Sequence, residues 1–349
     1  MFRFLSALLL FLLSGCQPGS PADHLLDDYL KRISRVTEME TPIQAEFTYP
    51  VLPPLKQRIY DIPDIRMKAL AALNLLECPR LSKVVAYRNS SLGRQMLPSQ
   101  RLHYEKELLN ELGDCIHYLQ ETEPKSEVLP ELKSISEQKQ KQLPAIRWNA
   151  LLGNVELSDQ LVLRPESLPE EHTGKTGTLN ALLYLNGYLP DQTLSPPYSR
   201  SEMERQLQQL TASHYSGQLL RSAIKLTETL NTVADLLEAR LKQRPLCPNG
   251  RLMPAAERLQ NVFHLLYASQ IQGYLSRIYR EGSEWRSAMK HLLEQLPAPP
   301  SPAMQHYLNQ ITSDNTPDSV WYQLEQAVKR HTSAWQAVLS ECNLMPAHR

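Results

Sequence analysis

Apolar side chains recur at intervals of three and four residues along most of this chain, which is the spacing of amphipathic α-helices. In the first half, the pattern predicts helices over residues 23–37, 64–76, 99–119, 127–142 and 178–189, with a further helix beginning at Pro79. In the second half, it predicts helices over residues 201–243, 254–276 and 284–296, and a last helix that begins at 316–318. Helical spacing dominates, so we expect an all-α fold, a bundle of antiparallel helices.

Residues 41–63 depart from this pattern because they contain five prolines. Proline removes a backbone donor and disfavours helix at the residue before it, so we expect a Pro-rich extended N-terminal segment that wraps over the body. Short strands are expected at residues 59–62 and 155–163. Residues 166–178 are expected to form a loop, residues 190–197 a linker, and the long helix 201–243 a bend at 213–217.

The N-terminus has the features of an export signal. Arg3 precedes an apolar run over residues 4–13, which is too short to span a bilayer. The sequence Leu13-Ser14-Gly15-Cys16 then resembles the lipobox of bacterial lipoproteins, in which the cysteine becomes the lipidated N-terminus. We therefore expect a signal peptide over 1–15, a tether over 16–22 lipidated at Cys16, and a helical periplasmic body over 23–349. The alternative is an ordinary secretory signal with a chance cysteine.

Localisation follows from the same resemblance. Gln17 follows the cysteine, where an aspartate favours retention in the inner membrane, so the expected location is the outer membrane, facing the periplasm. The length also allows two lobes, at about residues 23–195 and 196–349.

Four cysteines remain after Cys16, namely Cys78, Cys115, Cys247 and Cys342. An even number in an exported protein indicates disulfides. Three pairings are open, and proximity along the chain favours Cys78–Cys115 and Cys247–Cys342. The chain lacks a CxxC motif, which argues against a zinc ribbon or a thioredoxin-like redox site.

Composition excludes further classes. The 37 Lys and Arg balance 37 Asp and Glu, so no nucleic-acid partner is expected. Histidine spacing gives no metal motif, a phosphate-binding loop is missing, and we expect neither metal nor cofactor. Three short matches to serine β-lactamase motifs occur, at residues 222–225, 313–315 and 175–177. Their order along the chain is wrong for that family, because the KTG triplet comes first instead of last.

Residues 87–101 are unusually rich in Arg, Ser, Asn and Gln. Arginine forks and a Ser-rich turn before a helix can hold a carboxylate or phosphate. The candidate ligand-binding residues are Arg88, Asn89, Ser90, Ser91, Arg94, Ser99, Gln100 and Arg101. The alternative is a loop whose polar groups only cap helix ends.

Together with Cys78 and Cys115, this loop resembles an uncharacterised family of proteobacterial lipoproteins known only as a domain of unknown function. The resemblance implies a Gram-negative envelope location and a bridge between those two cysteines. It implies no activity and no catalytic residues.

Three functions follow as expectations. The first is a non-enzymatic, membrane-anchored scaffold or adaptor that contacts an envelope protein. The alternative is a binding protein for a small anionic ligand or cell-wall fragment, which uses the Arg-rich loop. A weaker alternative is an envelope hydrolase.

Overall fold

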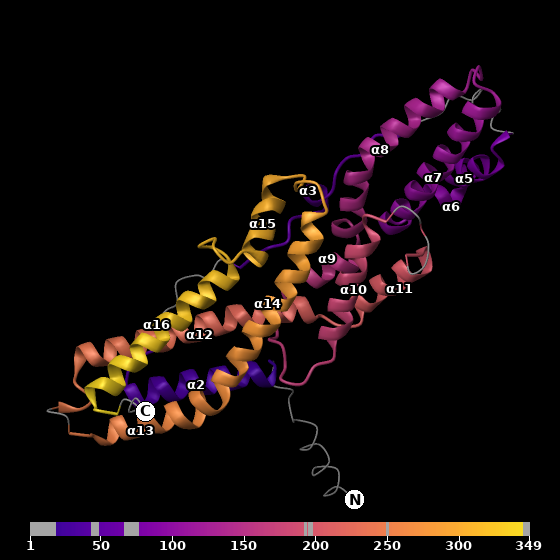
Figure 1. Ribbon diagram of the computed structural model, residues 1–349. Helices are drawn as coiled ribbons and strands as arrows, with labels where there is room; N and C mark the ends of the chain where they lie inside the picture. The colour runs from indigo at the N-terminus through magenta and orange to yellow at the C-terminus, as the bar shows by residue number, and fades with distance from the viewer. Residues whose placement is uncertain are drawn as a thin grey trace, which may run out of the picture.

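The helices of this protein lie side by side in an elongated body, as the computed structural model in Figure 1 shows. The structure describes residues 19–42, 49–65, 77–191, 194, 198–248 and 251–344, and within these ranges every regular element is helical. The lipobox, Cys16 and most of the predicted helix at 64–76 lie outside the described residues. The expected all-α fold is confirmed.

The elements of the N-terminal half are α2 (Pro21–Thr37), α3 (Leu55–Arg58), α5 (Pro79–Asn89), α6 (Ser91–Arg94), α7 (Pro98–Thr122), α8 (Leu129–Leu152), α9 (Val155–Leu161) and α10 (Gly174–Tyr188). Those of the C-terminal half are α11 (Arg200–Thr211), α12 (Tyr215–Gln243), α13 (Pro254–Val262), the π-helical η4 (Phe263–Ile271), α14 (Gln272–Glu294), α15 (Pro302–Thr312) and α16 (Val320–Glu341).

Helix α2 begins two residues earlier than predicted because of a capping box. Ser20 accepts a hydrogen bond from the backbone of Asp23, whose carboxylate accepts one from the backbone of Ser20. The same carboxylate accepts hydrogen bonds from the backbone and hydroxyl of Ser167, at 3.1 and 2.6 Å. The start of α2 is therefore anchored to the loop before α10. At the other end of the chain, Ser319 caps α16 where the sequence pattern predicted a start at Thr316.

The long helix predicted over 201–243 is two helices, α11 and α12, and the break has a side-chain cause. The buried amide of Gln160 donates to the carbonyls of Leu210 and Ser213 at the end of α11. Its oxygen accepts from the backbone N–H of Ser216, 3.2 Å away, at the start of α12. One distant glutamine thus satisfies polar groups that a continuous helix would have paired internally.

Both predicted strands are wrong. Residues 155–161 form α9, because Asn154 caps its first turn. Residues 59–62 are extended but pair with a side chain, as described below. Helix α8 also runs past the predicted end at Gln142 and through Pro144, which is exposed. Residues 254–294 form one continuous helical run with a π-helical middle, and α15 was not predicted.

The buried apolar residues form two clusters. The larger takes in residues from Ala22 to Cys342, and the smaller lies between α5, the later part of α7 and the first part of α8. Helices α7 and α8 are antiparallel and contribute to both clusters, since Leu102 and Leu143 pack in the larger one while Leu112 and Leu132 pack in the smaller one. They form the projecting arm at the upper right of Figure 1.

Two disulfides join elements that are distant in sequence. Cys78–Cys115 joins the start of α5 to α7, and Cys247–Cys342 joins the chain just after α12 to the end of α16. Both favoured pairings are confirmed. Helices α12 and α16 pack side by side and the second bridge links their C-terminal ends, so the two helices run in the same direction. The run α13–η4–α14 returns the opposite way (Figure 1).

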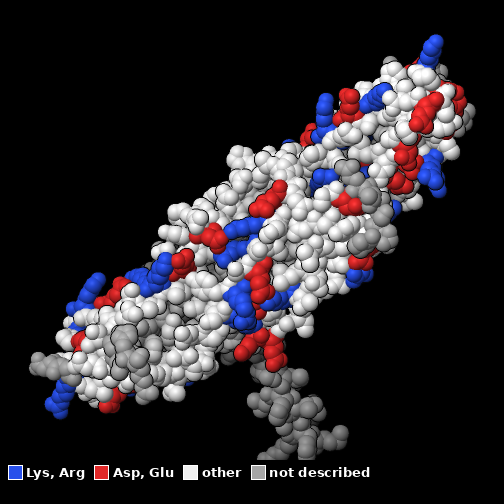
Figure 2. Space-filling view, in the orientation of Figure 1, with Lys and Arg blue, Asp and Glu red and all other residues white. Residues whose placement is uncertain are grey.

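Close packing of α14 against α16 depends on a glycine. A Cβ on Gly282 would lie 2.3 Å from the indole of Trp321, which is 2% exposed. Basic and acidic side chains alternate along the face of the body in Figure 2, and neither sign forms an extended patch on that face.

Candidate functional site

The Pro-rich segment over residues 49–65 is extended apart from α3, and side chains of the bundle hold it in place. Asn149 of α8 accepts a hydrogen bond from the backbone N–H of Tyr60 and donates one to its carbonyl, both at 2.8 Å. The indole of Trp148 donates to the carbonyl of Arg58. Ser301, the N-cap of α15, donates to the carbonyl of Gln57. The segment therefore lies extended against the bundle, as the prolines predicted, and these side-chain hydrogen bonds hold it there.

Two cavities lie beside this segment. The first, here named the Arg94 cavity, has a volume of about 310 Å³ and lies between Leu55, Tyr60, Arg88, Arg94 and Asn149. The second, here named the Arg58 cavity, has a volume of about 930 Å³ and is lined by residues 49–54, residues 162–165, Arg58 and Arg221. The segment therefore contributes side chains to both.

Three of the predicted ligand-binding residues come together. Arg88 and Arg94 line the Arg94 cavity, and with Asn89 they also line an adjoining cavity of about 650 Å³. Arg88 donates to the carbonyl of Gly93 at 2.7 Å and lies 3.5 Å from Asp64. Arg94 is exposed. Arg88 therefore fixes the loop, and Arg94 is the cation that this loop presents at the cavities.

Other predicted residues have structural partners instead. Ser90 caps α6 by accepting from the N–H of Gly93, and Gln100 accepts from the N–H of Leu97. Ser99 is buried and donates to Glu204 of α11. These contacts agree with the capping interpretation of the loop. Ser91, the first residue of α6, is exposed.

Arg101 belongs to an ion cluster that joins α7 to α8. Its Nε lies 2.6 Å from the carboxylate of Glu105, which is 1% exposed, and the Nζ of Lys139 lies 2.9 Å from the same carboxylate. Two cations share one buried anion, so Arg101 is engaged before any ligand arrives, although it borders the Arg94 cavity.

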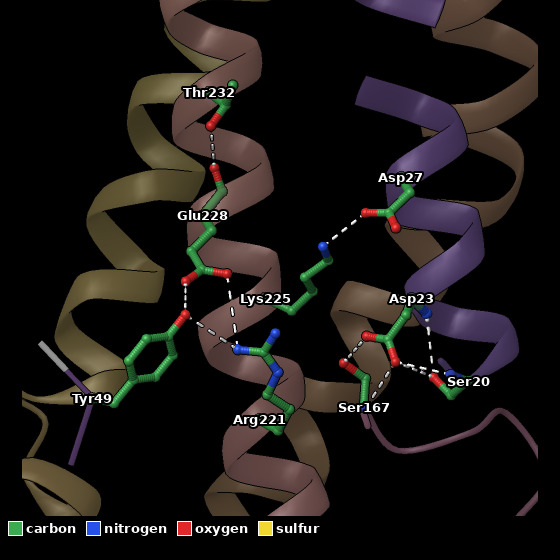
Figure 3. Close-up of polar contacts among 9 residues, drawn as sticks. All are labelled: Ser20, Asp23, Asp27, Tyr49, Ser167, Arg221, Lys225, Glu228 and Thr232. Carbon is green, nitrogen blue, oxygen red and sulfur yellow. Dashed lines mark hydrogen bonds and ion pairs between the residues drawn. The ribbon is translucent and has the colours of Figure 1, made fainter. Parts of the chain in front are cut away.

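The Arg58 cavity holds arginines that sequence reasoning missed. Arg164 pairs with Asp159 at 2.5 Å. Arg221 lies 4.0 Å from Glu228, whose carboxylate accepts a 2.6 Å hydrogen bond from the hydroxyl of Tyr49 (Figure 3). Arg58, Arg164 and Arg221 are far apart in sequence, and no motif connects them.

All three arginines have a buried Nε without a hydrogen-bond partner, and Arg58 differs from the other two in lacking an ion pair among the described residues. Its Nε and Nη1 atoms are buried and have no hydrogen-bond partner. Burial lowers the pKa of the Arg58 guanidinium, and the hydroxyl of Tyr307 opposes this shift. Within the described ranges, no carboxylate forms an ion pair with it.

The residues that resemble β-lactamase motifs do not form a catalytic group. The Ser222 hydroxyl donates to the carbonyl of Gln218 and accepts from the N–H of Leu168. Lys225 forms an ion pair with Asp27 at 2.7 Å, which Figure 3 shows, and Lys175 pairs with Glu284. These pairs stabilise helix packing, in line with the rejection of that motif on sequence order.

Several titratable groups are buried within the helix packing. Burial lowers the pKa of Lys106 to about 7 and that of His331 to about 3. His172 lies 3.2 Å from Glu281, which is buried. None of these four residues lines the cavities described above.

The described part of the chain contains no group of three or more His, Cys, Asp or Glu side chains arranged to hold a metal ion. No helix in the described ranges is both long and apolar enough to cross a membrane.

Comparison with known proteins identifies the family. No curated protein and no solved structure matches the chain. A family model described as "Protein of unknown function (DUF3080)" matches residues 26–346, which cover the body from α2 to the end of the described chain. The sequence resemblance to an uncharacterised family is thereby confirmed, and the chain belongs to the DUF3080 family.

Proposed function

We propose that this protein is a lipid-anchored, non-enzymatic protein of the cell envelope that acts as a scaffold or adaptor for an envelope protein. The anchor rests on the export signal and on Cys16, which becomes the N-terminus after cleavage. Several acyl chains on one cysteine make a stable anchor. The outer membrane, facing the periplasm, is the proposed location because Gln17 stands where an inner-membrane signal would have aspartate.

The start of α2 determines how such an anchor would hold the body. Ser20 is fixed by its contacts with Asp23, which Ser167 also binds (Figure 3). Residues 16–19 span at most about 14 Å when fully extended. Helix α2 begins near the middle of the long axis in Figure 1. A short tether at that point would keep the body close to the membrane surface. Both ends of the elongated body would then be available to a partner.

The observation that carries the adaptor proposal is the exposed apolar surface around the Arg94 cavity. Leu92 and Leu97 are 76% and 50% exposed on the loop that presents Arg94, and Leu55, which lines the cavity, is 48% exposed. Apolar side chains grouped around a concave site are typical of protein–protein interfaces. A partner segment with apolar side chains and one carboxylate would fit this surface.

Crosslinking in the native envelope tests the proposal. The tagged, lipidated protein is mildly crosslinked, purified, and its partners are identified by mass spectrometry. We expect a near-stoichiometric envelope protein that is lost in the double variant Leu92→Glu, Leu97→Glu. Leu265→Glu is the matched control, because Leu265 is 66% exposed on η4 of the main body. Equal recovery from all variants, or recovery of the lipoprotein alone, would contradict the proposal.

A second candidate function is supported by the position of Arg94. Arg88, Asn89 and Arg94 line one concave surface, which is the geometry that an anion-binding loop requires. Muramyl dipeptide, a cell-wall fragment with a carboxylate, is the probe for this candidate. Binding that is abolished by Arg94→Gln would favour this function over the adaptor, whereas no binding to the unmodified protein would exclude it for this ligand.

A further inference from the structure

The lining of the Arg58 cavity combines three arginines with apolar side chains. The cavity volume of about 930 Å³ is enough for a small ligand. The walls come from the Pro-rich segment over residues 49–54 and from residues 162–165, which connect α9 to the loop before α10. Val51 and Val162 remain 76% and 41% exposed there. Apolar walls of this kind accommodate a hydrocarbon chain.

Positive charge exceeds negative charge at this cavity. Three guanidinium groups line it, while their described ion pairs involve two carboxylates, Asp159 with Arg164 and Glu228 with Arg221. Arg58 is the remaining cation. Its Nε and Nη1 are buried and unpaired, and buried polar groups in proteins nearly always have a partner. Arg58 is half-buried as a whole, and its charge has no counter-ion among the described residues, so an anionic ligand in the cavity would balance it.

Hydrogen bonds hold the backbone on both sides of Arg58, beginning with the one from Ser301 to the carbonyl of Gln57. The carbonyl of Arg58 accepts the hydrogen bond from Trp148. The next residue but one, Tyr60, is held by Asn149. The guanidinium is therefore supplied by a rigid segment, so little conformational entropy is lost when a ligand binds. Planar guanidinium groups bind carboxylates and phosphates through paired hydrogen bonds.

We propose that the Arg58 cavity binds a single-chain anionic amphiphile, with its oxyanion headgroup at Arg58 and its apolar chain along Val51 and Val162. The headgroup is a carboxylate or a phosphate monoester, as in a fatty acid or a lipid phosphate. This site is distinct from the Arg94 cavity and does not depend on the adaptor proposal.

Equilibrium dialysis of short, soluble probes tests the site. The lipidated protein is placed in phosphatidylcholine nanodiscs, and binding to empty nanodiscs is subtracted. The probes are hexanoate, hexyl phosphate, hexanol and inorganic phosphate. We expect saturable binding of hexanoate or hexyl phosphate at one site per chain, and the tighter of the two identifies the headgroup. Hexanol and inorganic phosphate should bind at least tenfold more weakly.

Variants locate the site. Arg58→Gln should weaken binding of the anionic probe at least tenfold, and Arg58→Lys should weaken it less. Val51→Asp places a negative charge on a largely exposed wall residue and should also weaken binding, without a change in a buried side chain. Arg80→Gln, which removes an exposed charge from α5, should leave binding unchanged.

Three results would overturn the proposal. The first is the absence of saturable binding of either anionic probe. The second is binding of inorganic phosphate as tight as that of hexyl phosphate. The third is binding of the anionic probe that persists in both Arg58→Gln and Val51→Asp. Circular dichroism shows whether each variant is folded. If Arg58→Gln does not fold, the binding of the anionic probe to Val51→Asp tests the proposal instead.

Discussion

Asn149 and Tyr60 exchange two hydrogen bonds of 2.8 Å, so that one side-chain amide satisfies both backbone polar groups of a residue 89 positions away. This contact takes the place of the strand pairing that residues 59–62 had suggested. It positions the backbone between the Arg94 and Arg58 cavities, and both candidate sites therefore depend on it.

Replacement of this amide should loosen the Pro-rich segment. Asn149→Ala removes both hydrogen bonds and should lower the free energy of unfolding by roughly 2–3 kcal/mol. Trypsin should also cut faster at Lys56 and Arg58, because the segment is released. Gln140→Ala, an exposed change on the same helix, is the control and should have little effect. Unchanged cleavage in Asn149→Ala would show that other contacts hold the segment.

The two disulfides should contribute unequally to stability. They close loops of 37 and 95 residues. An entropic model gives about 3.8 and about 4.7 kcal/mol for loops of these lengths, so the Cys247→Ser, Cys342→Ser variant should be the less stable. Urea unfolding of each double variant measures this order, and the reverse order would refute the loop-length explanation.

The same urea unfolding experiment can show whether the two apolar clusters unfold independently. All four tryptophans belong to the larger cluster, so their fluorescence reports on that cluster alone. Loss of Cys78–Cys115 should shift the transition seen by far-ultraviolet circular dichroism more than the one seen by fluorescence. Coincident shifts would mean that α7 and α8 couple the clusters into one cooperative unit.

The buried ion cluster between α7 and α8 should be sensitive to loss of its anion. Glu105→Gln leaves the ammonium of Lys139 buried without a counter-charge, and we expect a cost of about 3–5 kcal/mol. The double variant Glu105→Gln, Lys139→Met should recover much of this loss, because the buried ammonium is removed together with its counter-charge and the remaining cation, Arg101, is partly exposed to water. Thermal unfolding is the measurement.

An exposed pair provides the control for this cluster. Asp28 and Arg32 form an ion pair at 2.9 Å on the surface of α2. Asp28→Asn should cost less than about 1 kcal/mol. A cost for Glu105→Gln as small as this would show that water reaches the cluster.

Buried histidine should make stability depend on pH. The imidazole of His331 is fully buried and lies 2.9 Å from the hydroxyl of Tyr29. Burial lowers its pKa from 6.5 to about 3. Between these values the unfolded chain takes up a proton that the folded chain does not. The contribution of His331 to the free energy of unfolding is therefore fully present above about pH 6.5 and is lost as the pH falls toward 3.

Urea unfolding at pH 7.5 and 4.5 tests this dependence. The unmodified protein should lose on the order of 2 kcal/mol through His331 alone between these two values. His331→Phe cannot be protonated, so its loss over the same interval should be smaller by that amount. His103, whose pKa burial lowers to about 4, contributes equally to both proteins and cancels in the difference. Identical pH profiles would disprove the assignment.

Local signals in the sequence were enough for the helical class, the extended Pro-rich segment and the start of α5 at Pro79. Each depends on neighbouring residues only, through apolar spacing, the fixed dihedral of proline, or short-range capping. The disulfide pairing was also predictable, because proximity along the chain favoured the pairs that form. The Arg-rich loop was recognised by composition, which showed a cluster of cations and hydroxyls but not how each is used.

Tertiary structure decided the rest, because the deciding partners are distant in sequence. Gln160 ends α11 from 50 residues away, and Glu105 engages Arg101 only because Lys139 of α8 shares the buried carboxylate. Arg58 lines its cavity without an ion pair among the described residues, and this becomes evident only when the side chains of distant elements have been placed. Helical periodicity thus determined what forms locally, whereas burial and long-range pairing determined which arginines remain available to bind.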